Sequence, residues 1–161
     1  MTINEVLELA NSIKKKFRKL NDWDITFNNK KTSFGTCSYE DKEIQLSKYL
    51  IGYMSEDAIK NTIIHEIAHA LTPNHGHNYV WRSKFIELGG NGKRVSGFEN
   101  FENGLNGGIA FLKNTSKYTL TCPVCGYAFY VNRKPKYECC CGKHGEKTYN
   151  PKYKLVLSEN R

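Results

Sequence analysis

The stretch HEIAHALTPNHGHNYVWRSKFIELGGNGKR, residues 65–94, carries the strongest fold and chemistry signals in the chain. It begins with His65 and His69, four positions apart, which on an α-helix share one face and can bind one tetrahedral zinc ion. Glu66 is turned about 100° around the helix from His65, so its carboxylate can reach a metal-held water without being a ligand. Zinc lowers the pKa of such a water toward ~7, and a carboxylate base can then deliver hydroxide to a carbonyl. The spacing predicts a hydrolytic zinc site with Glu66 as general base.

The residues around the motif predict the helix that this site requires. Ser55 is a suitable N-cap, Glu56 and Asp57 follow in the first turn, and Pro73 ends the helix. Between these ends, apolar residues recur at helical spacing: Ile59, Ile63, Ile64, Ile67, Ala68 and Leu71. We therefore expect the two histidines on a capped, partly buried helix.

A catalytic zinc also needs a third protein ligand, and two histidines follow Pro73. We favour His77, because it would stand at the start of a next helix over residues 78–88, which Gly89-Gly90 ends. His75 lies within an Asn-His-Gly turn, where it could be solvent-exposed or support the ligands. His65, His69 and His77 are thus the predicted ligands of the catalytic zinc.

The remaining N-terminal sequence predicts a helix and a small sheet. Apolar spacing from Thr2 to about Leu20 fits an amphipathic helix. Three short stretches rich in β-branched and aromatic residues follow, separated by turns, and they predict a mostly antiparallel sheet: Trp23–Asn28, Ser33–Tyr39 and Glu43–Leu46. Cys37 would be a strand residue without a chemical role. Residues 91–114, rich in Gly and Asn, are expected to form a long connection that lines the cleft.

The C-terminal cysteines predict a second zinc site. Five of the six cysteines lie between Cys122 and Cys141, whereas a disulfide scaffold would usually spread them along the chain. Cys122-Pro-Val-Cys125-Gly126 has the form of a zinc knuckle. The second pair of ligands should follow a hairpin whose arms would be Phe129–Val131 and Lys136-Tyr137.

That second pair is ambiguous in the sequence. Cys139 and Cys141 form a pair ahead of a glycine, and Cys141 with His144 has the usual gap of two residues. We favour Cys139 with Cys141, with His144 and Cys140 as alternates. Because all four positions would be filled by protein, this zinc should be structural.

Charge separates the two parts of the chain. The net charge is +8, of which residues 1–112 hold +1, from 14 Lys/Arg and 13 Asp/Glu, and residues 113–161 hold +7, from 10 and 3. A small basic module favours a nucleic-acid partner, although a Lys-rich tail can also serve solubility. Arg133, Lys134 and Lys136, at the predicted hairpin tip, are the candidate phosphate contacts.

Residues 65–94 strongly resemble the SprT-like family. In that family the metal helix is followed by a third histidine with an aromatic residue four positions on, and His77 with Trp81 match this spacing better than His75 with Tyr79. The resemblance is close over about residues 55–95. It implies a gluzincin-like metalloprotease that acts on DNA-bound or DNA-crosslinked proteins, and the family often carries a C-terminal zinc ribbon.

We therefore predict an α+β fold with a minigluzincin-like metalloprotease domain, residues 1–114, and a zinc-ribbon domain, residues 115–161. The expected cofactors are one catalytic and one structural zinc ion, and the expected partners are protein substrates and DNA. No apolar run approaches the ~20 residues that span a bilayer, and the first residues lack the order of a secretion signal, so we expect a cytoplasmic monomer without a membrane partner.

Two other functions are compatible with the sequence. The chain could be a non-catalytic nucleic-acid-binding accessory protein that retains the HExxH zinc site, or a zinc hydrolase with a non-peptide substrate. Glu66 argues against the accessory protein, because binding alone has no need of that carboxylate. Tyr53 and Tyr79 are candidate oxyanion donors, although packing alone would also explain them.

Overall fold

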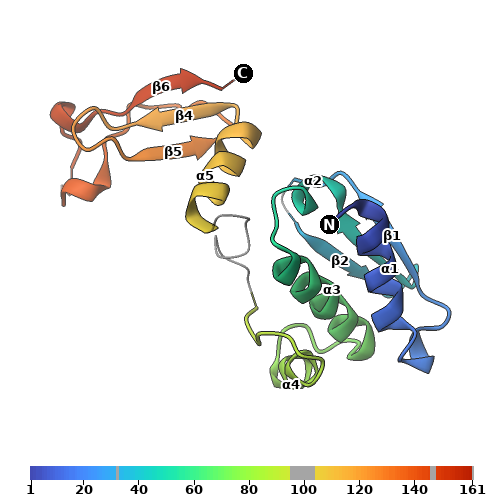
Figure 1. Ribbon diagram of the computed structural model, residues 1–161. Helices are drawn as coiled ribbons and strands as arrows, with labels where there is room; N and C mark the ends of the chain where they lie inside the picture. The colour runs from blue at the N-terminus through green and yellow to red at the C-terminus, as the bar shows by residue number, and fades with distance from the viewer. Residues whose placement is uncertain (32, 95–103, 146–147, 161) are drawn as a thin grey trace. The chain divides into compact units, whose positions relative to one another are not determined.

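The computed structural model describes residues 1–31, 33–94, 104–145 and 148–160. The chain divides into two compact units, Met1–Gly108 and Ile109–Arg161. The division falls within helix α5, Gly104–Thr115, whereas the sequence placed the boundary after residue 114. Helices and small sheets make this an α+β protein (Figure 1).

The first unit contains a three-stranded mixed sheet. Its strands are β1 (Asp24–Asn28), β2 (Gly35–Ser38) and β3 (Glu43–Ser47), in the order β1-β3-β2. β2 and β3 form an antiparallel hairpin, but β1 pairs with β3 in parallel, so the expectation of a mostly antiparallel sheet is wrong for this ladder. The hairpin occupies one edge of β3, which leaves only the other edge for β1.

Helices pack against this sheet, and one of them carries the metal motif. The first unit contains α1 (Ile3–Lys14), α2 (Lys48–Ile51), α3 (Glu56–Leu71) and α4 (Tyr79–Glu87). A capping box between Thr2 and Glu5 starts α1. This helix is shorter than predicted, because Phe17 is extended and Arg18–Leu20 forms a 3₁₀ turn that buries Leu20 completely.

Helix α3 is fixed on both sides. Ser55 is its N-cap, as predicted, and its side chain accepts a hydrogen bond from the Ala58 amide. On one side α3 packs against α1, β2 and β3, and on the other against α4 (Figure 1). Buried Ile64 and Ala68 of α3 meet Trp81 and Phe85 of α4. Burial of these large apolar side chains positions α4 relative to the metal motif.

The second unit contains an antiparallel sheet. Its strands are β4 (Tyr118–Thr121), β5 (Ala128–Val131) and β6 (Val156–Glu159), in the order β5-β4-β6. The partner of β5 is therefore β4, and the expected second hairpin arm at Lys136-Tyr137 is wrong. Tyr137 is 83% exposed, whereas Leu120 of β4 is buried, so β4 offers β5 an apolar face that Tyr137 does not.

Part of the expected connection over residues 91–114 is helical. Residues 95–103 lie outside the described part, but α5 occupies Gly104–Thr115. Its glycines have a low helix propensity, but burial of the Phe111 side chain stabilises the helix. None of the helices in the described ranges combines the length and apolar character that crossing a bilayer requires.

Candidate functional site

Three histidine side chains converge at one point in the first unit. His65 and His69 lie on α3, and His77 lies just before α4. The Nε2 atom of His77 is 3.1 Å from Nε2 of His65 and 3.1 Å from Nε2 of His69. Two nitrogens bound to a tetrahedral zinc at the usual bond length are about 3.3 Å apart, so this donor set fits zinc. His75 stays outside the cluster, where its ring lies against the Asn78 amide.

The surroundings keep these imidazoles neutral, which is the form that binds a metal. Burial, reinforced by the neighbouring histidines, lowers the pKa of His65 to about 3. Burial and the nearby His77 lower the pKa of His69 to about 4. The pKa of His77 is also lowered, first by burial and then by the positive charge of Arg94.

Trp81 supports all three rings from one side. Its ring centroid lies 4.7 Å from that of His65, 5.1 Å from that of His69 and 4.6 Å from that of His77. Trp81 is 1% exposed and packs on Phe85, so its own position is fixed by the core. An aromatic residue four positions after His77 thus restricts the orientation of the whole histidine cluster.

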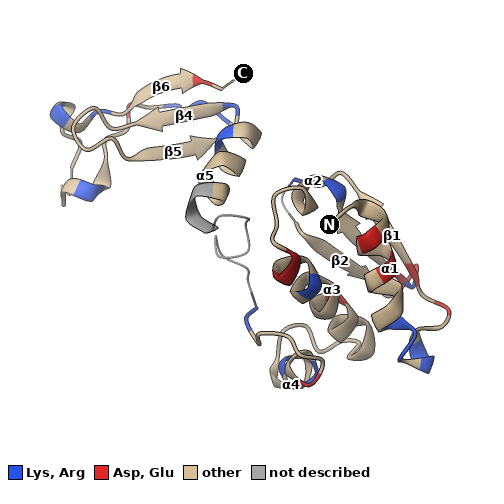
Figure 2. Ribbon diagram, viewed as in Figure 1, with Lys and Arg blue, Asp and Glu red and all other residues tan. Residues whose placement is uncertain are grey.

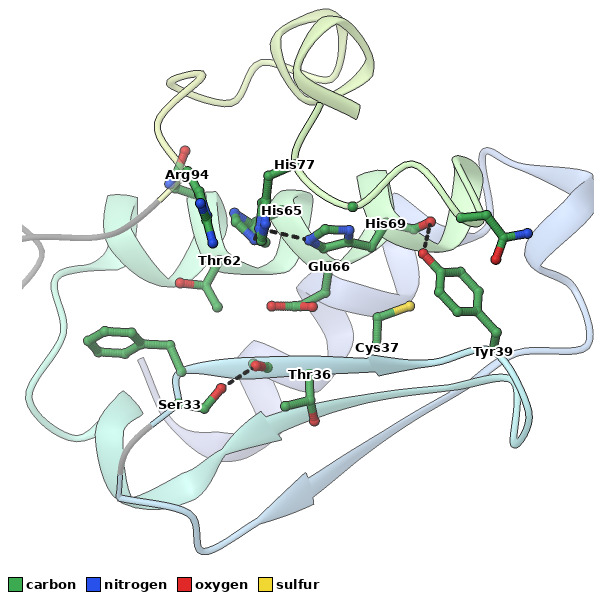
Figure 3. A pocket seen from close by; sticks show the side chains of 15 residues that line it. Ser33, Thr36, Cys37, Tyr39, Thr62, His65, Glu66, His69, His77 and Arg94 are labelled. Carbon is green, nitrogen blue, oxygen red and sulfur yellow. Dashed lines mark hydrogen bonds between the residues drawn. The ribbon is translucent and has the colours of Figure 1, made fainter. Parts of the chain in front are cut away.

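Glu66 lies beside the cluster, at the bottom of an open cleft of about 760 Å³. Figure 3 shows the carboxylate between helix α3 and strand β2. The side chain is 6% exposed, and burial raises its pKa to about 7. A carboxyl group with such a pKa can accept and return a proton near neutral pH.

Two further cleft residues were missed by the sequence interpretation. Arg94 lines the cleft near His77, and Tyr39 donates a hydrogen bond from its hydroxyl to the His69 carbonyl, 2.9 Å away (Figure 3). Tyr39 belongs to no motif, so only tertiary structure could place it. Arg94 ends the stretch 65–94 that resembles the family, which is the one sequence signal that could have pointed to it. Tyr53 and Tyr79, the candidate oxyanion donors, are not among the residues that line this cleft, and Tyr79 is 80% exposed.

Cys37 lies in strand β2, as predicted, and its side chain faces the same cleft. Burial raises the pKa of its thiol to about 12, with the nearby Glu66 adding to the shift. The thiol is therefore protonated at neutral pH. Its lack of a role in the chemistry stays a prediction.

A second cluster of donors lies in the other unit, formed by Cys122, Cys125, Cys141 and His144. Sγ of Cys122 is 3.4 Å from Nε2 of His144, and the sulfurs of Cys125 and Cys141 are 3.9 Å apart. Tetrahedral zinc separates a sulfur and a nitrogen by about 3.5 Å and two sulfurs by about 3.8 Å. This set of three cysteines and one histidine therefore fits zinc as well.

The structure brings His144, one of the two alternates, to this cluster and leaves the favoured Cys139 outside it. Which of the two binds the metal stays a prediction. Cys139 is exposed and its thiol points at the Tyr137 carbonyl, while the Cys140 thiol points at the Thr148 carbonyl. His144 instead reaches the cluster through the 3₁₀ turn Gly142–His144 that follows Cys141.

Local contacts hold the four donors in place. Gly126 adopts a positive φ of 70°, and its amide donates to the Cys122 carbonyl, which closes the predicted knuckle turn. The ring of His144 stacks on Tyr153 with centroids 3.9 Å apart. Desolvation raises the pKa of Cys122, but hydrogen bonds from the Cys125 and Val124 backbone and from His144 outweigh it and bring the pKa to about 6. The thiolate that zinc requires is thereby favoured.

The candidate phosphate contacts are exposed and follow β5. Lys134 forms an ion pair with Glu159 at 2.8 Å, whereas no ion pair involves Arg133 or Lys136 within the described ranges. Further cations of this unit include Lys143, which lies over the ring of Tyr127 just ahead of β5, and Lys152, which lies in the 3₁₀ turn ahead of β6. Figure 2 shows Lys and Arg distributed over this unit. Among the described residues, Arg133 and Lys136 are therefore more available than Lys134 for contacts with phosphate.

Comparison with known proteins identifies the first unit. The SprT-like family profile matches residues 3–99, more than half of the chain, and this range contains the three histidines, Glu66 and most of the cleft's surroundings. The cysteine-bearing unit lies outside the match. A comparison with curated proteins returned no match. The family is one of metalloprotease-like domains and implies zinc, in agreement with the donor geometry. The chain therefore belongs to the SprT-like family.

Proposed function

We propose that the protein is a zinc-dependent endopeptidase with a minigluzincin-like domain, and that its substrates are DNA-bound or DNA-crosslinked proteins. One observation carries the peptidase proposal: three neutral imidazoles converge beside a buried carboxylate in an open cleft. The three-histidine set leaves one tetrahedral position for a reactant. The cleft is open to a polypeptide, and this separates the site from a purely structural metal centre.

The proposed chemistry assigns a role to each residue. His65, His69 and His77 would hold the zinc ion, which supplies Lewis acidity toward a carbonyl oxygen and toward water when bound. Glu66 would take the proton from the attacking water on its carboxylate and return it to the leaving amine. Arg94, the cation at the cleft, is placed to interact with a substrate carbonyl as negative charge develops on it.

The second unit is proposed to be a zinc ribbon that docks on nucleic acid. Its excess of positive charge and the exposed Arg133 and Lys136 support this, because phosphate contacts dominate nucleic-acid affinity. Its zinc would be structural, since Cys122, Cys125, Cys141 and His144 fill all four positions. Docking would then choose substrates by their location on DNA.

The test is cleavage of a DNA-binding protein by the wild type and by Glu66→Gln, with and without DNA and before and after chelation. We expect the wild type to cleave, DNA to accelerate cleavage, and Glu66→Gln to lose activity by at least about 10³-fold while zinc content is unchanged. Normal proteolysis by Glu66→Gln would contradict the mechanism. Tight DNA binding without any cleavage would instead favour the non-catalytic accessory protein.

A further inference from the structure

Gly35, the first residue of β2, lies directly against Glu66. A Cβ atom at position 35 would lie 2.7 Å from Cγ of Glu66, 2.7 Å from Oε1 and 3.0 Å from Cδ. Carbon atoms in packed interiors approach to about 3.5–4.0 Å, so no side chain fits there while Glu66 keeps its place. Glu66 occupies the volume that the glycine leaves open.

Packing is the main constraint on this carboxylate. Glu66 is 6% exposed, yet within the part of the chain that the structure describes no hydrogen bond or ion pair to its side chain is found. Helix α3 and strand β2 enclose it from two sides (Figure 3). Since no described protein group bonds to the carboxylate, the β2 wall limits where its Cγ, Cδ and Oε1 atoms can lie.

Strand β2 lies at the edge of the sheet and is held from one side by β3. Gly35 pairs with Leu46 in the antiparallel ladder between β2 and β3, and its carbonyl accepts a hydrogen bond from the Ser33 hydroxyl at 2.5 Å. Helix α3 is equally constrained by its packing on α4. A new side chain at position 35 would therefore move Glu66 more readily than it would move the strand.

We propose that Gly35 is a positioning residue for Glu66: the missing side chain seats the carboxylate beside the three-histidine cluster. This inference rests on the proposed function for its catalytic consequence, and on geometry alone for the contact. Proton transfer requires hydrogen-bond reach, and a displacement of about 1 Å at a reacting group costs on the order of 10²-fold in rate.

Alanine is a clean probe at this position. Gly35 lies in a strand and is not among the glycines with positive φ, so alanine can adopt its backbone conformation. Gly52 offers a matched control, because a Cβ there would meet only the Tyr49 carbonyl oxygen at 3.7 Å, an ordinary contact. Both substitutions add one methyl group. They differ in the space around it, which Glu66 fills at position 35 and which is open at position 52.

The first test compares Gly35→Ala and Gly52→Ala in zinc-loaded full-length protein. We expect Gly35→Ala to keep its zinc, to lower kcat by about tenfold to a hundredfold, and to change KM by less than about twofold. Gly52→Ala should match the wild type in all three quantities. A kcat for Gly35→Ala within about twofold of wild type would overturn the inference.

The second test measures thermal unfolding and needs no activity. Gly35→Ala should lower Tm by roughly 5 °C in the wild-type background and by much less in the Glu66→Ala background, where Cγ, Cδ and Oε1 are gone. Equal losses in both backgrounds would refute the contact. If the wild type cleaves nothing, the proposed function fails, and this thermal coupling still decides whether Gly35 seats Glu66.

Discussion

The two candidate metal centres of this protein use similar chemistry in opposite settings. The histidine cluster of the first unit offers three donors at the side of a cleft of about 760 Å³, with the carboxylate of Glu66 next to it. The cysteine cluster of the second unit offers four donors, two of them fully buried. Three donors leave a position for a reactant, whereas four leave none.

This difference shows which features distinguish the proposed catalytic centre from the proposed structural one. Both sets of donors fit tetrahedral zinc by their distances, so metal affinity alone does not distinguish them. The distinction lies in the neighbours: a proton acceptor and open space at one centre, and closed knuckle turns at the other. Substitutions that affect one centre at a time can test whether the roles are separate.

The largest effect is expected from removing a ligand of the first centre. His69→Ala should lose one zinc per chain and lower kcat/KM by more than about 10³-fold, because two imidazoles no longer hold the ion in place. Metal analysis and peptide cleavage measure the two quantities. The cysteine centre should keep its zinc, and loss of both ions from this variant would mean that the centres are not independent.

Removing a ligand of the second centre should disrupt the fold of the second unit and leave peptide cleavage unchanged. Cys122→Ser should lose the other zinc and the chemical-shift dispersion of strands β4, β5 and β6, because structural zinc sites stabilise their fold directly. Cleavage of a short peptide without DNA should stay within about twofold of wild type. A collapse of peptide cleavage would show that the second unit contributes to the reaction itself.

The choice of the fourth ligand can be tested with a matched pair of substitutions. His144→Ala should weaken zinc binding at the second centre by more than about tenfold, because it removes a donor 3.4 Å from the Cys122 sulfur. Cys139→Ser should leave zinc affinity unchanged, since its thiol points at the Tyr137 carbonyl. Competition with a chromogenic chelator measures both affinities, and the reverse order would restore Cys139 as the ligand.

The smallest effect concerns the reactivity of the cysteines outside the second centre. The thiolate is the reactive form, and burial raises the pKa of Cys37 to about 12, so at pH 8 only about one molecule in 10⁴ is ionised there. Iodoacetamide should label exposed Cys139 at pH 8 and leave Cys37 unmodified, with labelling of Cys37 rising as pH increases. Mass spectrometry of digested protein follows both sites, and rapid modification of Cys37 at pH 8 would contradict its burial.

Much of the candidate site in the first unit could be predicted because its signals are local. His65, Glu66 and His69 are placed by the 3.6-residue period of one helix, and Ser55 and Pro73 mark its ends. His77 followed from its position at the start of the next helix and from the resemblance to the family. Helical spacing alone thus brings His65 and His69 together and places Glu66 beside them.

Tertiary structure decided everything that depends on contacts between distant segments. Sequence order does not specify that β1 pairs in parallel with β3, or that His144 rather than Cys139 lies beside Cys122, Cys125 and Cys141, because turns and packing set those distances. Arg94 and Tyr39 have no fixed spacing from the histidines and reach the cleft only through the fold. The seat that Gly35 provides for Glu66 is of the same kind, since two residues far apart in sequence exclude each other's volume only when helix α3 packs on strand β2.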